Sequence, residues 1–254
     1  MMPFEDARAE SAIGDLPPGW CDVIGGGRMG TALAAALRLA QVPVRGPLGR
    51  GADAAGAALV LLCVPDREIA SASATIRDGA IVGHMSASAN LSVLAPHDRF
   101  VLHPLLSVIG AGASFAGASC AVDGSSAEAL GVARALAVRL GMRARRILPE
   151  QRALYHAAAS AASNYLTTVE GLAERLANMV GLDRSDLLPL VRSAVDNWGE
   201  RGARVALTGP VSRGDDETVA QQRAAVSAAA ADELPLWDAL VIATRDLAQS
   251  APRS

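Results

Sequence analysis

Three glycines near the start of the chain, at positions 25, 27 and 30, constrain its fold most strongly. They follow a short apolar run, Cys21 to Ile24, and open a stretch with helical spacing from about Arg28 to Ala40. In such a turn between a strand and a helix, the glycines permit the tight turn, the approach of a pyrophosphate and close helix–strand packing. The position predicts a dinucleotide-binding turn. Its residues are Gly25, Gly26, Gly27, Arg28, Met29 and Gly30. The alternative is a plain structural loop that happens to be rich in glycine.

Strand-like and helix-like runs alternate from this turn to about residue 148. Val42–Val44 is typical of a short second strand, and residues 57–64 form a continuous apolar run, as buried parallel strands do. The further expected elements are helices at 66–76 and 125–140 and strands at 79–84, 99–103, 119–123 and 143–148. The alternation predicts an α/β fold with a Rossmann-type parallel sheet over residues 20–148, after a leader of residues 1–19.

Strand signals stop after Pro149. Residues 149–180 have the pattern of one long helix that Gly181 ends, and helices are also expected at about 185–200 and 235–249. Another helix begins after the loop 207–215, with Asp215 or Asp216 as its cap. Residues 149–254 are therefore predicted to form a smaller all-α domain.

Composition excludes several classes of protein. The net charge of −3 argues against a nucleic-acid binder, and the absence of lysine excludes a P-loop and a Schiff-base enzyme. The odd cysteine count and the acidic start without an apolar core indicate a cytoplasmic protein, and no apolar run reaches membrane-spanning length. Neither a metal-ligand spacing such as HExxH nor a GxSxG elbow is present, so no metal site or serine hydrolase is expected.

The expected cofactor is NADP. Sites for NAD usually place an acid about twenty residues beyond the glycine turn. Here Arg45 and Arg50 occupy that stretch, and the first carboxylate is Asp53. Either arginine is able to meet a ribose 2′-phosphate, and the alternative is that both are simply solvated.

Two later strand ends are also expected to line the cofactor, because ligands of open α/β sheets bind at the carboxyl ends of strands. Val64, Pro65 and Asp66 end the third strand, and Ser86 follows the next one. For Asp66 an equally good reading is that it caps the following helix.

The histidines supply the candidates for proton transfer. His103 follows the strand at 99–103, where the cluster that continues to Ser107 is expected to meet substrate, so it is the preferred candidate. His84, also at a strand end, is equally consistent with a satisfied core residue. His97 lies in a polar loop and is expected to be exposed.

The long helix is predicted to present one small polar face. Its members are His156, Ser160, Ser163, Asn164 and Thr167, with Glu170 beside them. The opposite face is the expected core face, formed by Leu154, Ala158, Ala162, Tyr165, Val169, Leu172 and Leu176. Small polar side chains suit a pocket wall, and the alternative is a polar seam between helices or subunits.

Several segments together resemble one family. They are the turn at 25–30, LLCVPD at 61–66, HPL at 103–105, YHAAASAASNYL at 155–166 and LTGPVSRGD at 207–215. They resemble Rossmann-like proteins with a C-terminal helical domain of unknown function, described as candidate NADP oxidoreductases, and the likeness spans about residues 20–245. The family is similar to pyrroline-5-carboxylate reductase and, more distantly, to prephenate dehydrogenase. The resemblance implies a cofactor site at 25–30 and 64–66, a substrate cleft between the domains and a homodimer formed through the helical domain.

The leading hypothesis is an oxidoreductase that moves a hydride between NADP(H) and a small carbonyl, imine or alcohol. His103 manages the proton, and Asn164 and Tyr155 hydrogen-bond the reacting atom. The residues expected to contact substrate are Ser107, His156, Ser163, Thr208 and Arg213. Arg213 would hold a substrate carboxylate, and its alternative is a structural ion pair with Asp215 or Asp216. The second hypothesis is a non-catalytic NADP-binding sensor or partner-docking protein.

Overall fold

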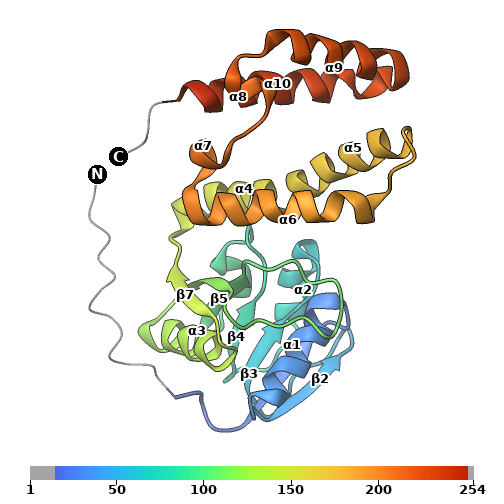
Figure 1. Cartoon of the computed structure of the whole chain (residues 1–254). Helices are drawn as coiled ribbons and strands as arrows, with labels where there is room; N and C mark the ends of the chain where they lie inside the picture. Colours follow the sequence, from blue (N-terminus) through green and yellow to red (C-terminus); the bar gives the residue numbers. More distant parts are fainter. Residues whose placement is uncertain (1–14, 251–254) are drawn as a thin grey trace. The chain divides into compact units, whose positions relative to one another are not determined.

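The computed structural model describes residues 15–250, so the first part of the expected leader lies outside the described residues. Contacts divide the chain into one unit that ends at Ser163 and a second that begins at Asn164. Figure 1 traces the elements in chain order. Every described strand lies in the first unit, and the second unit is helical. The predicted fold class, an α/β domain followed by a smaller all-α one, is confirmed.

The first unit is built on a seven-stranded sheet with the order β2-β1-β3-β4-β5-β6-β7. The strands are β1 Trp20–Ile24, β2 Val44–Leu48, β3 Ala57–Leu62, β4 Ile81–His84, β5 Arg99–Pro104, β6 Ser119–Gly124 and β7 Arg143–Arg146. Strands β1 to β5 are parallel, but β6 runs antiparallel to β5, and β7 follows the direction of β6. The prediction of a wholly parallel sheet is therefore wrong for the last two strands. The segment between β5 and β6 contains no helix to carry a parallel crossover.

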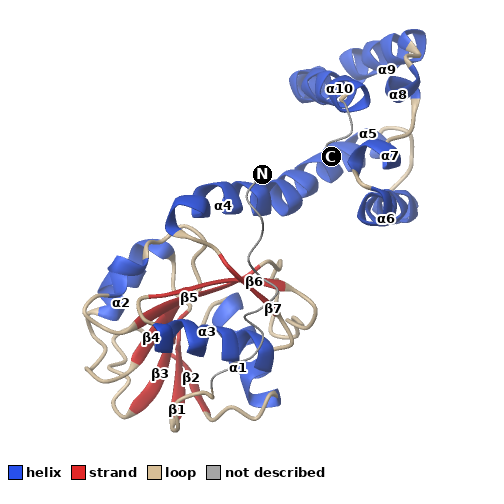
Figure 2. Cartoon of the chain, turned by 90° about the vertical axis from the view of Figure 1, so that its left-hand side faces the viewer, coloured by secondary structure: helices blue, strands red, loops and turns tan. Residues whose placement is uncertain are grey.

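Two apolar cores cover the two faces of the sheet. On one face, α1 Arg28–Leu39 and α3 Ala127–Arg139 pack against the strands (Figure 2), with Leu33, Leu37 and Leu136 fully buried. The other core gathers residues of β3 and β4 with side chains from the short helices. These helices are the 3-10 turn Asp66–Glu68, α2 Ile69–Ser73 and the 3-10 turn Leu91–Leu94. The strand ends that carry the predicted site therefore rise from a sheet that is fixed on both sides.

The second strand differs from the prediction. It was expected at Val42–Val44, yet it runs from Val44 to Leu48. The register to β1 shifts between the Asp22 and Ile24 pairs, and Gly46, at φ +109°, lies at this bulge. A Cβ on Gly46 would stand 2.4 Å from the Val23 carbonyl oxygen. Because β2 is an edge strand, the glycine and Pro47 are tolerated, and the strand continues where the sequence suggests a break.

The first unit ends in the helices that follow β7. A 3-10 turn at Pro149–Gln151 leads into α4 Arg152–Ser160, and a π-helical turn at Ala161–Tyr165 follows. The expected long helix is therefore present but is interrupted by the π turn. A π turn contains more residues than an α turn, so the faces before and after it fall out of phase. This explains why Leu154 and Tyr165, assigned to the core face, are 78% and 64% exposed, whereas Leu172 is buried.

The second unit consists of short and long helices connected by brief turns. They are α5 Leu166–Asn178, α6 Arg184–Arg201, α7 Ala203–Ala206, α8 Pro210–Arg213, α9 Asp216–Ala229 and α10 Leu234–Gln249. Asp215 is the N-cap of α9, as one of the two predicted alternatives has it, and accepts a hydrogen bond from the Thr218 backbone. None of the helices within residues 15–250 is long and apolar enough to cross a membrane.

Candidate functional site

The glycine turn has the close contacts that its sequence predicts. Gly25 sits at φ +114°, and a Cβ there would lie 2.4 Å from the Cys63 carbonyl oxygen. A Cβ on Gly30 would lie 1.9 Å from the Gly25 carbonyl oxygen, so α1 packs against the turn only with glycine at this position. Gly26 and Gly27 are different, since a Cβ on either would meet no atom within 4 Å. The turn thus leaves open space directly above its own backbone.

Helix α1 begins at this open space. Its N-cap is Gly27, which offers no side chain, and the first turn holds no acidic residue. The first backbone N–H groups of a helix have no partner within the helix, and they carry the positive end of its dipole. An uncapped helix start beneath an open glycine backbone suits an anion such as a phosphate. Arg28 is exposed and Met29 half-buried at this place.

The two candidate arginines of the ribose region have separate environments. Arg45 is the second residue of β2 and lies level with Asp22 of β1, below the end of both strands. Both arms of its guanidinium donate to the buried Asp22 carboxylate at 2.6 Å. Arg50 follows the end of β2, is exposed, and pairs with Glu68 at 3.0 Å. The alternative reading, that both arginines are simply solvated, is wrong for Arg45, which pairs with a buried carboxylate, whereas the Arg50 side chain is 84% exposed and its ion pair lies in solvent. Arg45 lies within the strand and not at its carboxyl end, so its position does not support contact with a ribose 2′-phosphate.

Asp66 does not cap a helix. The N-cap of the short helix after β3 is Pro65, and the Asp66 carboxylate instead accepts hydrogen bonds from the hydroxyls of Ser86 and Ser88, each at 2.7 Å. Ser86 Oγ also accepts from the backbone N–H of Ala89 at 2.9 Å. The chain after β3 and the chain after β4 are thereby tied together at the carboxyl edge of the sheet. Val64 and Pro65 precede Asp66 at this edge.

His84 is a buried histidine that is only partly satisfied. Its Nδ1 accepts from the Ser86 backbone N–H at 3.2 Å, while its Nε2 is buried with no hydrogen-bond partner among the described residues. Burial, with smaller effects of the Arg152 charge and of His103, lowers the pKa of His84 to about 4, while Asp66 acts in the opposite direction. His97, expected to be exposed, is buried, and its Nε2 lies 3.2 Å from the Ser73 carbonyl oxygen. That loop folds back onto α2, which its polar sequence does not reveal.

His103 and Tyr155 form a pair between β5 and α4. The Tyr155 hydroxyl lies 2.8 Å from His103 Nδ1 and donates to the His103 carbonyl oxygen at 3.2 Å. The rings meet edge to face, with centroids 5.6 Å apart. Burial lowers the pKa of His103 to about 4, with a smaller effect of His156 in the same direction and of Asp66 against it. Burial raises the pKa of Tyr155, so both groups are neutral near pH 7.

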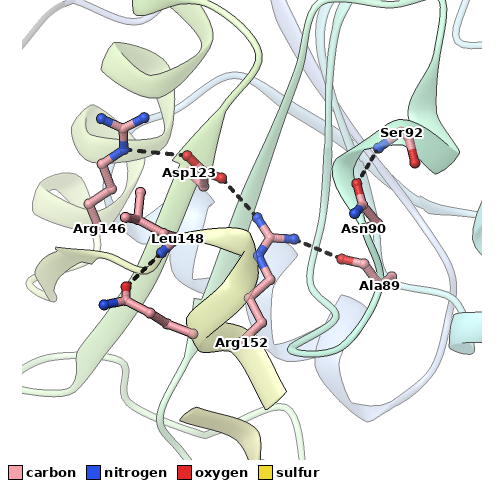
Figure 3. A network of polar contacts seen from close by, with 8 residues as sticks. Ala89, Asn90, Ser92, Asp123, Arg146, Leu148 and Arg152 are labelled. Carbon is pink, nitrogen blue, oxygen red and sulfur yellow. Dashed lines mark hydrogen bonds and ion pairs between the residues drawn. The ribbon is translucent and has the colours of Figure 1, made fainter. Parts of the chain in front are cut away.

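A buried ion pair fixes the start of α4 to the sheet (Figure 3). The Arg152 guanidinium donates to Asp123 of β6 at 3.1 Å and to the Ala89 carbonyl oxygen at 2.8 Å. The side chains of Arg152 and Asp123 are 8% and 6% exposed, and Arg146 approaches the other Asp123 oxygen at 3.4 Å. Arg152 also lines a cavity of about 10 Å³ together with His103 and Tyr155. It therefore connects the His103–Tyr155 pair with the segment that holds Ser86 and Ser88.

The remaining predicted residues do not form one polar face. His156 is exposed and acts electrostatically on His103, Ser163 is half-buried, and Asn164 is exposed on the π turn. Ser107 is exposed in the segment after β5. The His156 and Asn164 positions are separated by the change of phase at the π turn, so the single face expected from α-helical spacing is wrong.

Thr208 and Arg213 are exposed in the second unit. The Asp215 carboxylate accepts from Thr218, and Asp216 pairs with Arg245. Within the described part of the chain neither carboxylate forms an ion pair with Arg213, so the alternative reading of a structural pair is not observed. The hydrogen bonds from Thr218, and to a smaller degree the Arg213 charge, lower the pKa of Asp215. Over residues 15–250 no cluster of three or more His, Cys, Asp or Glu side chains is arranged to hold a metal ion.

Sequence reasoning missed two parts of this site. Arg152 and Asp123 were not predicted, because their role depends on which strands lie side by side. Asp22 offered a signal: a single carboxylate within an otherwise apolar strand is costly to bury unless a partner faces it. The Arg45 side chain is that partner.

Together the mixed sheet, the glycine turn and the separate helical unit define the class: a Rossmann-type domain followed by a helical C-terminal domain. The chain belongs to the family described as a domain of unknown function, DUF2520, which residues 118–244 match. The resemblance found in the sequence is thus confirmed. No curated protein matches the chain.

Solved structures show the same fold. A Bacteroides fragilis protein described as a candidate NADP oxidoreductase is 21% identical, with a TM-score of 0.77 over 90% of this chain and 98% of that one. A Thermotoga maritima protein is 23% identical, with a TM-score of 0.73 over 92% and 100%. The Plasmodium falciparum pyrroline carboxylate reductase with NADP bound is 11% identical, with a TM-score of 0.61 over 92% and 100%.

Proposed function

We propose that the protein is an oxidoreductase that transfers a hydride between NADP(H) and a small carbonyl, imine or alcohol. The observation that carries the proposal is the open backbone of Gly26 and Gly27 above the uncapped start of α1. This arrangement fits a cofactor pyrophosphate, because backbone N–H groups face the space that a side chain would otherwise fill. The names of structural neighbours, an NADP oxidoreductase candidate and an NADP-bound reductase among them, support the same cofactor.

The choice of NADP over NAD rests in this proposal on Arg50. It follows the carboxyl end of β2, where the adenosine ribose of a Rossmann cofactor lies. Glu68 already neutralises part of its charge in an exposed ion pair, and such a pair costs little to break. Arg50 is therefore available to a 2′-phosphate.

The chain's own residues would orient the substrate and handle one proton, while the bound nicotinamide supplies or takes up the hydride. Asp66, Ser86 and His103 lie at or just after the ends of β3, β4 and β5, the edge at which this fold binds ligands. Tyr155 orients the His103 ring by its contact at 2.8 Å. In the second unit, Asn164, Thr208 and Arg213 are proposed to contact the substrate.

The proposal includes a homodimer formed through the helical unit. Helix α6 has 18 residues and none of them is buried. Leu190 and Trp198 on this helix are 70% and 58% exposed, which is unusual for large apolar side chains in the absence of a partner. A cytoplasmic setting is also proposed, in keeping with three free cysteines, whose thiols have pKa values that burial raises to about 12.

Calorimetry with NADP+, NADPH, NAD+ and NADH tests the proposal. We expect NADP(H) to bind at least about tenfold more tightly than NAD(H), since one charge-assisted contact to a phosphate is worth about that factor. A screen of small oxo acids, imines and alcohols then detects turnover at the NADPH absorbance band. Binding of none of the four nucleotides would overturn the proposal, and binding without any turnover would favour the sensor hypothesis.

A further inference from the structure

Two arginines at the carboxyl edge of the sheet share one carboxylate. Arg50 follows the end of β2, and Arg67 lies in the 3-10 turn Asp66–Glu68 that follows β3. A single oxygen of the Glu68 side chain, Oε1, lies 3.0 Å from Arg50 Nη2 and 4.0 Å from Arg67 Nε. Guanidinium groups from the ends of two different strands therefore converge on the same negatively charged atom.

The strands that lead to these arginines lie next to the glycine turn. In the sheet, β2 and β3 are the two neighbours of β1, and the end of β1 leads into the turn at residues 25–30. In a Rossmann-type sheet the adenosine ribose lies beyond the end of the second strand, beside the pyrophosphate on the glycine turn. Arg50 and Arg67 are therefore at the ribose end of the cofactor site that the proposed function describes.

The position of the Glu68 side chain is not explained by helix capping. Glu68 is the N-cap residue of α2, but its side chain accepts no hydrogen bond from that helix. The Glu68 side chain is nevertheless only 21% exposed, whereas the side chain of Arg67 is 86% exposed, much like that of Arg50. The arginines are thus open to a ligand, and the carboxylate between their charges is partly covered by the chain.

The charges of this cluster do not balance. Two guanidinium groups face one carboxylate, and the neighbouring Asp66 carboxylate is bonded instead to serine hydroxyls after β4, each at 2.7 Å. A phosphate monoester carries about 1.5 to 2 negative charges at pH 7 and has three terminal oxygens as acceptors. Because both arginine contacts meet at one oxygen, their nitrogens are close enough together for a single phosphate to accept from both. A phosphate is therefore a stronger anion for this position than the carboxylate.

We propose that Arg67 binds the 2′-phosphate of NADP(H) together with Arg50, and that Glu68 is an internal anion which this phosphate displaces. The inference rests on the proposed function and adds two residues to its cofactor site. Without a ligand, Glu68 keeps the two guanidinium groups near one point. When NADP(H) binds, the Glu68 carboxylate loses its partners and lies beside a second negative charge, which weakens binding. NAD(H) has no 2′-phosphate and leaves the Glu68 contacts in place.

Two substitutions test the inference by the direction of their effects in calorimetry. Arg67→Gln should weaken NADPH binding about tenfold, because a charge-assisted contact to the phosphate is lost. Glu68→Gln should strengthen NADPH binding about twofold to fivefold, the value of an exposed charge pair, because the phosphate no longer displaces a carboxylate. Both variants should bind NADH as the wild type does, and this unchanged binding shows that the variants are folded.

Arg77→Gln is the matched control. The Arg77 side chain is also exposed and pairs with a carboxylate, that of Asp53 at 2.8 Å, but it lies before the start of β4 and not at a carboxyl end. This variant should change neither the NADPH nor the NADH affinity. Adenosine 2′,5′-bisphosphate and adenosine 5′-monophosphate, which differ only in the 2′-phosphate, should repeat the pattern of NADPH and NADH in all three variants.

Weaker or unaltered NADPH binding in Glu68→Gln would refute the role of Glu68. An unaltered ratio of the NADH and NADPH dissociation constants in Arg67→Gln would refute the role of Arg67. Either result, obtained with a wild-type protein that binds NADPH, would leave the proposed function standing. Failure of the wild type to bind any of the four nucleotides would overturn the proposed function itself.

Discussion

Arg152 and Tyr155 lie one helical turn apart on α4, and they contact the sheet at two levels: Arg152 pairs with Asp123 of β6, and Tyr155 pairs with His103 of β5. Residues three positions apart on a helix project from the same side. The ion pair therefore determines how the helix presents Tyr155 to His103. Arg152 and Asp123 are almost completely buried, and removing either one would leave the other as a costly buried charge.

We predict that Arg152→Met lowers the free energy of unfolding by roughly 3–5 kcal/mol, because it leaves a buried carboxylate with only a distant partner. Arg146→Met is the matched control. It removes an arginine next to the same carboxylate, but Arg146 is half exposed and approaches only to 3.4 Å, so its loss should cost about 1 kcal/mol or less. Urea denaturation of both variants provides the comparison. Equal losses would show that Arg152 has no special role at the start of α4.

Whether a feature of the fold or of the site is predictable from the sequence depends on how far apart in the chain its contacting residues lie. The strand, the glycine turn and the helix at its start were predicted correctly because these elements are contiguous in the chain, while the binding of a dinucleotide at the turn stays a prediction. The ends of β3, β4 and β5 were also predicted to lie at one edge of the sheet, since parallel strands bring their carboxyl ends together. The Arg152–Asp123 pair joins residues 29 positions apart, and no local pattern indicates which strand neighbours which.

The errors have equally specific causes. Gly46 and Pro47 suggest the end of a strand, but on an edge strand they only produce a bulge, so Arg45 was placed at a strand end when it lies near the beginning. Helical spacing was applied without interruption across residues 161–165, where the π turn changes the phase. Neither a bulge nor a π turn leaves a reliable mark in a single sequence.

Gly27→Ala should weaken NADPH binding by about tenfold to a hundredfold without destabilising the protein. The added methyl group meets no atom of the chain within 4 Å, so it occupies only the space predicted for the pyrophosphate. Gly131→Ala, within α3, is the matched control, because its Cβ is also unobstructed and it should leave NADPH affinity unchanged. Calorimetry measures both. Unaltered affinity in Gly27→Ala would mean that no phosphate lies on this turn.

Arg45 in β2 and Arg50 just after it should have different effects, the first on stability and the second on the choice of cofactor. Arg45→Met leaves the buried Asp22 without its bidentate partner, and we expect the free energy of unfolding to fall by roughly 1–3 kcal/mol, the cost of an unsatisfied buried polar group. Arg50→Gln should leave stability within about 0.5 kcal/mol, since its ion pair is exposed. It should reduce the preference for NADPH over NADH by about tenfold. The ratio of the dissociation constants for NADH and NADPH, measured for both variants, tests whether Arg50 sets the cofactor preference. A ratio that changes only in Arg45→Met would assign this role to Arg45 instead.

The two neutral histidines predict how stability depends on pH. For His84 and His103 the pKa falls from the ordinary 6.5 to about 4 on folding, so between these values the unfolded chain binds more protons than the folded one. The contribution of these histidines to the free energy of unfolding then decreases as the pH falls from about 6.5 towards 4, and it is constant above this window. His84→Gln removes one of the two contributions and should flatten the decrease, although it will also change the stability at pH 7. Urea midpoints at pH 7, 6 and 5 give the slope. If the variant and the wild type lose stability in parallel over this window, His84 is not held neutral by its burial.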